Sequence, residues 1–173
     1  KTQFGGGKEI DSFSGVEKLY NQGNQPCLHD AWLFNYSGKP WLAQKWSRAI
    51  LDSFYGSTPY HGWEGDEDEG QMGGWYVMSA LGLFEMNGGA SLRPELELTS
   101  PLFNKVTIHL DPDYYKGKTF TIEARNNSKE NIYIQKAYLN GKELKQPRIP
   151  FTAITAGGVL LLEMGDKPGY TCF

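Results

Sequence analysis

Five acidic side chains lie within six consecutive positions, Glu64 to Glu69, and only Gly65 interrupts them. Carboxylates repel one another, and their charge is costly to desolvate beside the apolar run that follows. Proteins tolerate such clusters mainly where the carboxylates act chemically, for example as general bases. The less specific alternatives are a solvated acidic surface and a set of helix N-caps. A calcium loop of the EF-hand type is disfavoured, because the alternating ligands and the terminal Glu are missing.

A helix is predicted over residues 70–82, directly after the acidic cluster. Its apolar side chains recur at roughly helical spacing, and Gly82 is a typical C-terminal stop. Asp66 or Asp68 can serve as the N-cap, and acids in a first turn complement the helix dipole. Both aspartates are therefore predicted at a junction between a loop and a helix, where a rigid scaffold commonly presents catalytic groups.

The rest of the chain divides into a helical part and a strand-rich part. Two more helices are predicted over residues 27–36 and 41–55, because each segment has an apolar stripe at helical spacing. After residue 90 the apolar pattern alternates, and short strands between turn-forming residues predict a β-sandwich. The predicted class is therefore α+β. The predicted strands are 95–99, 105–110, 119–124, 132–138 and 159–164.

Composition and charge exclude several classes of partner. The net charge of −3 comes without a basic patch, so nucleic acid is not an expected partner. No apolar stretch approaches the ~20 residues that a membrane span needs. Cys27 and Cys172 permit at most one disulfide, and the sequence leaves their pairing open. The triplets that begin at Asn35 and Asn126 fit the N-glycosylation pattern, which is only weak support for secretion.

The acidic cluster also belongs to a longer motif. The run Gly65-Asp66-Glu67-Asp68-Glu69-Gly70-Gln71-Met72 continues into Trp75-Tyr76-Val77 and Ser79-Ala80-Leu81-Gly82. Together these segments resemble the signature of glycoside hydrolase family 92. The resemblance covers nearly the whole chain, in the order of the family. Further matching segments are Gly23-Asn24-Gln25-Pro26, Asn35-Tyr36-Ser37-Gly38-Lys39-Pro40-Trp41, Ser100-Pro101-Leu102-Phe103, Asn126-Asn127-Ser128 and Leu139-Asn140-Gly141.

The resemblance implies an activity and a fold. Members of the family are calcium-dependent, inverting exo-α-mannosidases, so the chain is expected to be part of an enzyme that removes terminal α-mannosides from mannose-containing glycans. An α-1,2 linkage, a role in N-glycan processing and a secreted, periplasmic or extracellular location are the accompanying expectations. The family's catalytic fold implies the last helices of an (α/α)6 toroid in residues 1–89 and a β-sandwich-like domain in residues 90–173.

The resemblance also implies that the chain is incomplete. The enzymes of the family are several times longer, so the chain corresponds to their C-terminal portion. The upstream part of the same enzyme, in one polypeptide or as a separate chain, is therefore an expected partner. The alternatives are a non-catalytic carbohydrate-binding relative and an isolated fragment.

Two aspartates carry the base role in this family, and they correspond to Asp66 and Asp68. Because these side chains are only two residues apart, they cannot easily flank a sugar from both faces, so both belong to the base side. Asp68 is predicted to take the proton from water while Asp66 assists it. The general acid is a Glu that is expected upstream of this chain.

The remaining site residues are also implied by position in the family. Asn24 is the predicted calcium ligand, since a hard cation takes oxygen ligands; a turn-forming role is the alternative. The predicted substrate-binding residues are Asn21, Gln22, Gln25 and His29. The Gln25 substitution and the absence of the general acid from this chain favour the non-catalytic alternative, and two positions depart from the family. Gln25 replaces the usual Glu, and His29 stands alone where two adjacent histidines are common, so a structural role for it is also open.

Overall fold

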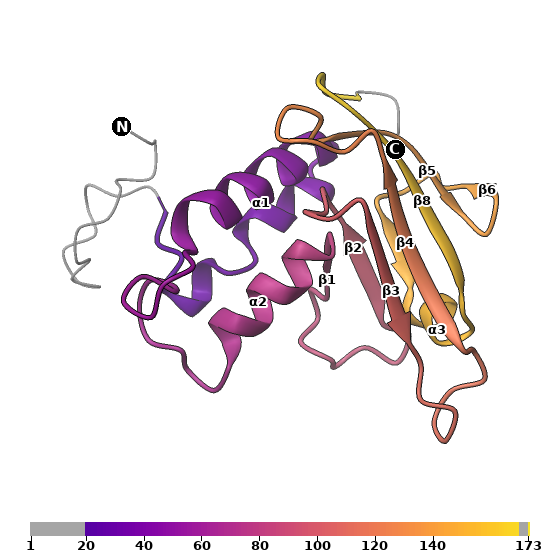
Figure 1. The fold of residues 1–173 in the computed structure, drawn as a ribbon, viewed down its shortest axis with the longest axis horizontal. Coiled ribbons are helices and arrows are strands. Elements are labelled where there is room, and N and C mark those ends of the chain that lie inside the picture. The colour runs from indigo at the N-terminus through magenta and orange to yellow at the C-terminus, as the bar shows by residue number, and fades with distance from the viewer. Residues whose placement is uncertain (1–19, 170–172) are drawn as a thin grey trace.

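The computed structural model describes residues 20–169 and residue 173. A helical layer, formed by α1 (Pro40–Phe54) and α2 (Gln71–Ala80), packs against a layer of β-sheets (Figure 1). The helices precede the sheets along the chain, so the predicted α+β class is confirmed. Within the described part of the chain, no helix is both long and apolar enough to cross a membrane.

Two of the three predicted helices are confirmed. α1 and α2 match the predicted segments 41–55 and 70–82 to within two residues at each end. The α-helix predicted over residues 27–36 is wrong. This segment instead contributes to two short 3₁₀ helices, η2 (Gln25–Cys27) and η3 (Asp30–Asn35).

A contact with α2 explains why residues 27–36 do not form an α-helix. In an α-helix the main-chain N–H of Trp32 would donate to the carbonyl oxygen of Leu28. Here it donates to the carbonyl oxygen of His29 at 2.9 Å, which is the shorter 3₁₀ pattern. The carbonyl oxygen of Leu28 instead accepts the indole N–H of Trp75 at 2.7 Å. A tertiary hydrogen bond therefore takes the acceptor that the local helix would need.

The described residues form two sheets, with the strand orders β1-β2-β7 and β3-β4-β8-β5-β6. Neighbouring strands are antiparallel except β4 and β8, which are parallel. All five predicted strands are present, to within one residue at each end. The strands are β1 (Leu83–Phe84), β2 (Glu95–Leu98), β3 (Lys105–His109), β4 (Thr119–Arg125), β5 (Tyr133–Leu139), β6 (Lys142–Glu143), β7 (Arg148–Pro150) and β8 (Gly158–Gly165), with α3 (Phe151–Thr155) between the last two.

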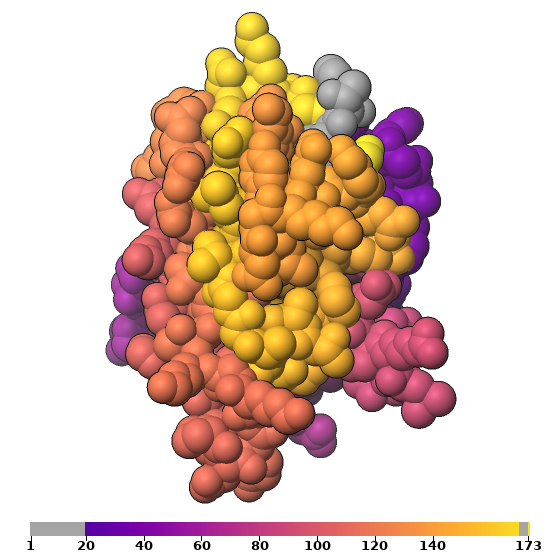
Figure 2. Space-filling model, turned by 90° about the vertical axis from the view of Figure 1, so that its right-hand side faces the viewer, coloured from indigo at the N-terminus to yellow at the C-terminus, as the bar shows by residue number. Residues whose placement is uncertain are grey.

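The larger apolar core contains buried side chains from both sheets, as in a sandwich. Leu98 and Ile149 come from the smaller sheet, and Phe120 and Leu162 come from the larger one; each is at most 1% exposed. Figure 2 shows the molecule from the right-hand side of Figure 1, and there β4, β8 and β5 lie side by side. β1 precedes residue 90 but pairs with β2, so hydrogen bonding crosses the predicted boundary, which itself stays a prediction.

A buried carboxylate joins the helical layer to the sheets. Glu97 of β2 is 1% exposed and accepts hydrogen bonds from the Asn35 amide at 2.8 Å and from the Tyr36 hydroxyl at 2.6 Å. The Arg148 guanidinium lies 3.9 Å from Glu97, so the buried charge is compensated. Asn35 also begins one of the two triplets that fit the N-glycosylation pattern. Since its amide is buried and hydrogen-bonded, this triplet is not accessible to glycosylation in the folded protein. In the triplet that begins at Asn126, Asn126 is exposed, and Asn127 and Ser128 are half-buried.

A second joint fixes α1 to the sheet layer. Arg48 of α1 is 6% exposed and donates to the Ser100 hydroxyl at 3.3 Å and to the Ser128 carbonyl oxygen at 3.0 Å. The side-chain oxygen of Gln44, also in α1, accepts the main-chain N–H of Ile134 at 2.8 Å. The sheets therefore hold α1, and with it the helical layer, in a defined orientation.

Candidate functional site

The acidic cluster forms the loop that leads into α2. Asp68, Glu69 and Gly70 have φ angles of 42°, 63° and 88°, so three successive residues adopt left-handed backbone conformations. Residues with side chains adopt this conformation at a cost, and they keep it only where surrounding contacts fix it. Helix α2 then begins abruptly at Gln71, with Gly70 as its N-cap residue.

Glu67, rather than a neighbouring aspartate, accepts a hydrogen bond from a main-chain N–H in the first turn of α2. Its Oε1 atom accepts the main-chain N–H of Gly73, the third residue of the helix, at 3.1 Å. The predicted N-cap role of Asp66 or Asp68 is therefore wrong, because Gly70 occupies that position. Both aspartates are exposed, whereas Glu67 is half-buried. Glu67 thus stabilises the start of α2, whereas the two aspartates are exposed to solvent.

Replacing Glu67 by alanine is expected to lower the free energy of unfolding by about 1 kcal/mol, because the N–H of Gly73 loses its acceptor. Thermal unfolding of the protein measures this change. The matched control is Glu69→Gln, which alters an exposed carboxylate of the same loop and should change the stability by less than ~0.5 kcal/mol. Equal destabilisation by the two variants would contradict the capping role.

The loop before η2 packs directly against the acidic loop. A Cβ atom added to Gly23 would lie 2.9 Å from Cα of Gly65, and one added to Gly65 would lie 2.7 Å from Cα of Gly23. Gly65 also has a φ angle of +76°. The two backbones therefore meet where only glycine fits. Asn24 and Asp66 each follow one of these glycines, so the contact brings the predicted metal ligand and a predicted base residue onto adjoining loops.

Two side chains reinforce this contact between the loops. The side-chain amide of Gln25 donates a hydrogen bond to Oδ2 of Asp68. The side-chain oxygen of Asn21 accepts the main-chain N–H of Gly23 at 3.0 Å, so Asn21 shapes the loop itself. The segment from Asn21 to Gln25 is thus held by hydrogen bonds both within the loop and to the acidic loop.

Gln22 lies beneath the loops and is fully buried. Its side-chain oxygen accepts the Tyr20 hydroxyl, and its Nε2 donates to the Tyr55 hydroxyl at 2.8 Å. The Tyr55 hydroxyl in turn donates to the carbonyl oxygen of Met72 in α2 at 3.1 Å. Burial raises the pKa of both tyrosines, that of Tyr55 to about 12, so both hydroxyls stay protonated at neutral pH. Gln22 therefore supports the loops from the interior.

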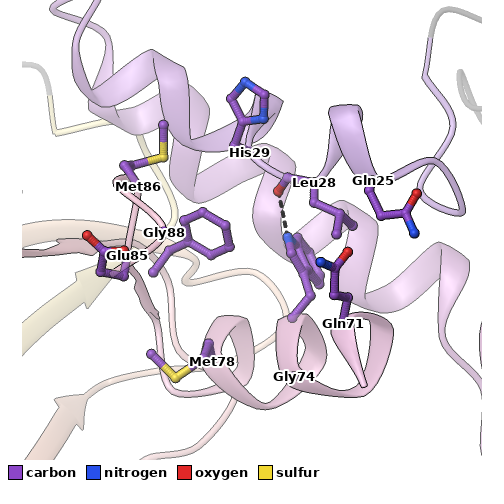
Figure 3. A pocket seen from close by; sticks show the side chains of 11 residues that line it. Gln25, Leu28, His29, Gln71, Gly74, Met78, Glu85, Met86 and Gly88 are labelled. Atoms are coloured by element: carbon purple, nitrogen blue, oxygen red, sulfur yellow. Dashed lines mark hydrogen bonds between the residues drawn. The ribbon is translucent and has the colours of Figure 1, made fainter. Parts of the chain in front are cut away.

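A pocket of about 470 Å³ opens beside these loops, between α2 and the segment of η2 and η3 (Figure 3). Gln25, His29, Gln71 and Glu85 supply polar groups, and the remaining walls are mostly apolar. The Trp75 indole is held by its hydrogen bond to the Leu28 carbonyl, the dashed line in Figure 3. Apolar walls with a few polar groups are typical of ligand pockets. The main apolar lining residues are Leu28, Trp75, Met78, Phe84 and Met86.

Asn24 has the chemistry of a calcium ligand. Its side chain is exposed, and its amide N–H donates to the Cys27 thiol at 3.7 Å. Its amide oxygen is of the ligand type that calcium takes. Asp66 adds carboxylate oxygens on the adjoining loop. In the described ranges, no three His, Cys, Asp or Glu side chains gather into a metal-binding group. Calcium takes about 6–8 oxygen ligands, so these residues fit a partial site that other groups would complete.

The structure thus sorts the seven predicted site residues into two groups. Five lie at the two loops or at the pocket margin: Asn24, Gln25, His29, Asp66 and Asp68. Asn21 and Gln22 instead support the loops through hydrogen bonds. Cys27 forms no disulfide with any described residue, and Cys172 lies outside the described residues, so their pairing stays untested.

Comparisons with known proteins show the same similarity along the chain. The family model described as the glycosyl hydrolase family 92 catalytic domain matches residues 3–166. An uncharacterized secreted glycosidase of Arthroderma benhamiae is 35% identical over 147 residues, which are 84% of this chain and 18% of that protein.

Solved structures share this fold. A family GH92 α-mannosidase of Bacteroides thetaiotaomicron matches with a TM-score of 0.80 at 32% identity, over 92% of this chain and 20% of that chain. A family GH92 inverting mannosidase of the same bacterium matches with a TM-score of 0.76 at 36% identity, also over 92% and 20% of the two chains. The chain therefore spans about a fifth of the length of these relatives. On the family model, the sequence identity and the shared fold together, this chain belongs to glycosyl hydrolase family 92, a family of glycoside hydrolases.

Proposed function

We propose that this chain supplies the general base of an inverting, calcium-dependent exo-α-mannosidase that hydrolyses terminal α-mannosides, with α-1,2 linkages as the preferred substrate. One observation carries the proposal. The exposed Asp66 and Asp68 lie on a loop that packs against the loop of Asn24 and Gln25, next to a pocket. One relative is named as an α-mannosidase and another as an inverting mannosidase, and these names support the choice of sugar and of stereochemistry.

In the proposed reaction, Asp68 removes a proton from a water molecule that attacks the anomeric carbon. The water approaches from the face opposite the leaving group, so the configuration at this carbon inverts. The bond between the anomeric carbon and the glycosidic oxygen breaks, and a general acid outside this chain protonates the departing oxygen. The acid and the base must stand about 6.5–9.5 Å apart to leave room for the water. Asp66 orients this water or the Asp68 carboxylate from the same side.

Asn24 would hold the calcium ion through its amide oxygen, with Asp66 as the nearest source of further oxygens. When bound, the ion supplies a positive charge that neighbouring sugar hydroxyls can coordinate. The upstream part of the enzyme would complete the ligand set and contribute the general acid. This part is the proposed partner of the chain.

His29 is proposed to bind the sugar beyond the scissile bond, since it lines the pocket beside the acidic loop. Gln25 lines the same pocket, but its side-chain amide donates to Asp68. Asn21 and Gln22 are proposed to act on the substrate only through the loop that they support. The relative described as a secreted glycosidase supports action on glycans outside the cytoplasm, in a secreted or periplasmic enzyme.

The test is free mannose released from α-1,2-linked mannobiose by the full-length enzyme, with and without a calcium chelator. We expect release that the chelator lowers by at least about 10-fold and that added calcium restores, because a coordinated ion positions the sugar hydroxyls. Release that resists the chelator would refute the calcium requirement. Binding of mannobiose without any release would instead favour a non-catalytic carbohydrate-binding protein, which the loss of the family's Glu at Gln25 already makes the second candidate.

A further inference from the structure

We propose that Gln25 is a positioning residue for the base, and that it holds the Asp68 carboxylate in its working orientation through a side-chain hydrogen bond. The inference rests on the proposed function, since it assigns Asp68 the role of general base. It differs from the role of a sugar-binding residue, which the position of Gln25 in the family implies. It also explains how this chain can work with an amide where relatives usually have a carboxylate.

The first argument is the hydrogen bond itself. The amide of Gln25 donates to Oδ2 of Asp68, across 43 positions of sequence. An ionised carboxylate only accepts hydrogen bonds, so a donor must stabilise it. A Glu in the place of Gln25 would present a second acceptor and a second negative charge to Asp68 when it is ionised. The amide is therefore the group that suits this contact.

The second argument is the backbone of Asp68. Its φ angle of 42° is left-handed, and the next two residues share this conformation. A strained loop of this kind keeps one conformation only where contacts over-determine it. The capping bond of Glu67 fixes the loop on the side of α2. The hydrogen bond from Gln25 is a second fixing contact, and it comes from the loop before η2.

The third argument is that Gln25 is itself held in place. It is the first residue of η2, and its carbonyl oxygen accepts the main-chain N–H of Leu28 at 3.0 Å. The preceding Gly23 touches Gly65 through the backbone, which sets the distance between the two loops. Pro26 follows directly, and its ring fixes the φ angle in the first turn of η2. A rigid donor can therefore orient a strained acceptor.

The experiment uses the full-length enzyme and an α-mannoside with an aryl leaving group. Gln25→Ala removes the donor, Gln25→Glu replaces it by an acceptor of the same length, and Glu69→Gln is the control in the acidic loop. For Gln25→Ala we expect a fall in kcat of about 30-fold with KM within about twofold, because only the orientation of the base is lost. Gln25→Glu should lower kcat at least as much, and the control should match the unaltered enzyme.

Two further measurements separate this role from others. Azide attacks the anomeric carbon without losing a proton, so it should restore turnover of Gln25→Ala, with a mannosyl azide of inverted configuration as product. Hydrogen exchange of the main-chain amides of residues 65–70 should accelerate in Gln25→Ala and stay unchanged in Glu69→Gln, because the loop loses a fixing contact.

The outcomes distinguish the two proposals. A higher KM with unchanged kcat would overturn the positioning role and make Gln25 a sugar-binding residue. An undiminished kcat in Gln25→Glu would also overturn it, because that variant has no amide donor. If the unaltered enzyme hydrolyses no α-mannoside, the proposed function and the base assignment both fail. The exchange data then still report whether Gln25 fixes the acidic loop.

Discussion

Replacing Asp68 by asparagine in the full-length enzyme is expected to lower kcat for α-mannoside hydrolysis about 10³-fold, because a positioned general base contributes roughly this factor. KM should change little, since the exposed carboxylate acts on water in the transition state and contributes little to ground-state binding. The measurement is steady-state release of mannose at saturating substrate and calcium. The folded state should be unaffected, because α2 is capped by Glu67 and keeps that contact.

The controls for Asp68→Asn come from the same loop. Glu69→Gln also removes one exposed negative charge, from the residue that directly follows the proposed base, so it reports any general effect of charge. It should leave kcat within about twofold of the unaltered enzyme. Asp66→Asn should fall between the two variants, as expected for an assisting carboxylate. If Asp68→Asn keeps full activity, another group is the base.

Replacing Gly65 by alanine is expected to lower kcat/KM at least about 100-fold, because displacing catalytic groups by roughly 1 Å has this effect. The new Cβ would lie 2.7 Å from Cα and 2.8 Å from the carbonyl oxygen of Gly23, so one loop must move away from the other. This movement separates Asp66 and Asp68 from Asn24 and Gln25. Calcium affinity should weaken in parallel, and titration of the variant with calcium measures it.

The matched control for Gly65→Ala is Gly38→Ala. Gly38 has a φ angle of +71°, close to the +76° of Gly65, but a Cβ added to it would meet no atom within 4 Å. Both variants therefore carry the backbone strain of about 1–2 kcal/mol for a left-handed alanine, and only one carries the clash. Gly38→Ala should unfold at a lower temperature than the unaltered enzyme and keep its kcat/KM. Similar losses of activity in both variants would refute the contact between the loops as their cause.

The helices and strands with strong local patterns were predictable. α1 and β4 were located to within one residue at each end, because period-3.6 and period-2 apolar patterns depend only on near neighbours. The segment 27–36 has a similar helical pattern and was predicted wrongly. The difference is the indole of Trp75, which occupies the Leu28 carbonyl from another helix. A local pattern contains no information about such a competitor.

The candidate site was predictable in composition but not in arrangement. The acidic cluster and the run from Asn21 to His29 stand out by residue type and by family resemblance. Which acid of the cluster caps α2 was not predictable, because any of them has the right chemistry to cap a helix. The contact between Gly23 and Gly65 was not predicted either. The only signal was a glycine directly before each of two predicted functional residues, and glycines in loops are common.

The sequence by itself determined the family, the order of the helices and strands, and the residues from which a site can be built, because motifs and periodicity are local properties. Only the tertiary structure decided which carboxylate serves the fold and which stay exposed. It also decided that Gln22 is interior, that Gln25 meets Asp68, and that two loops touch at a pair of glycines. These features depend on contacts between segments some 40 residues apart. Such contacts form only when packing of the helical layer on the sheets brings the segments together.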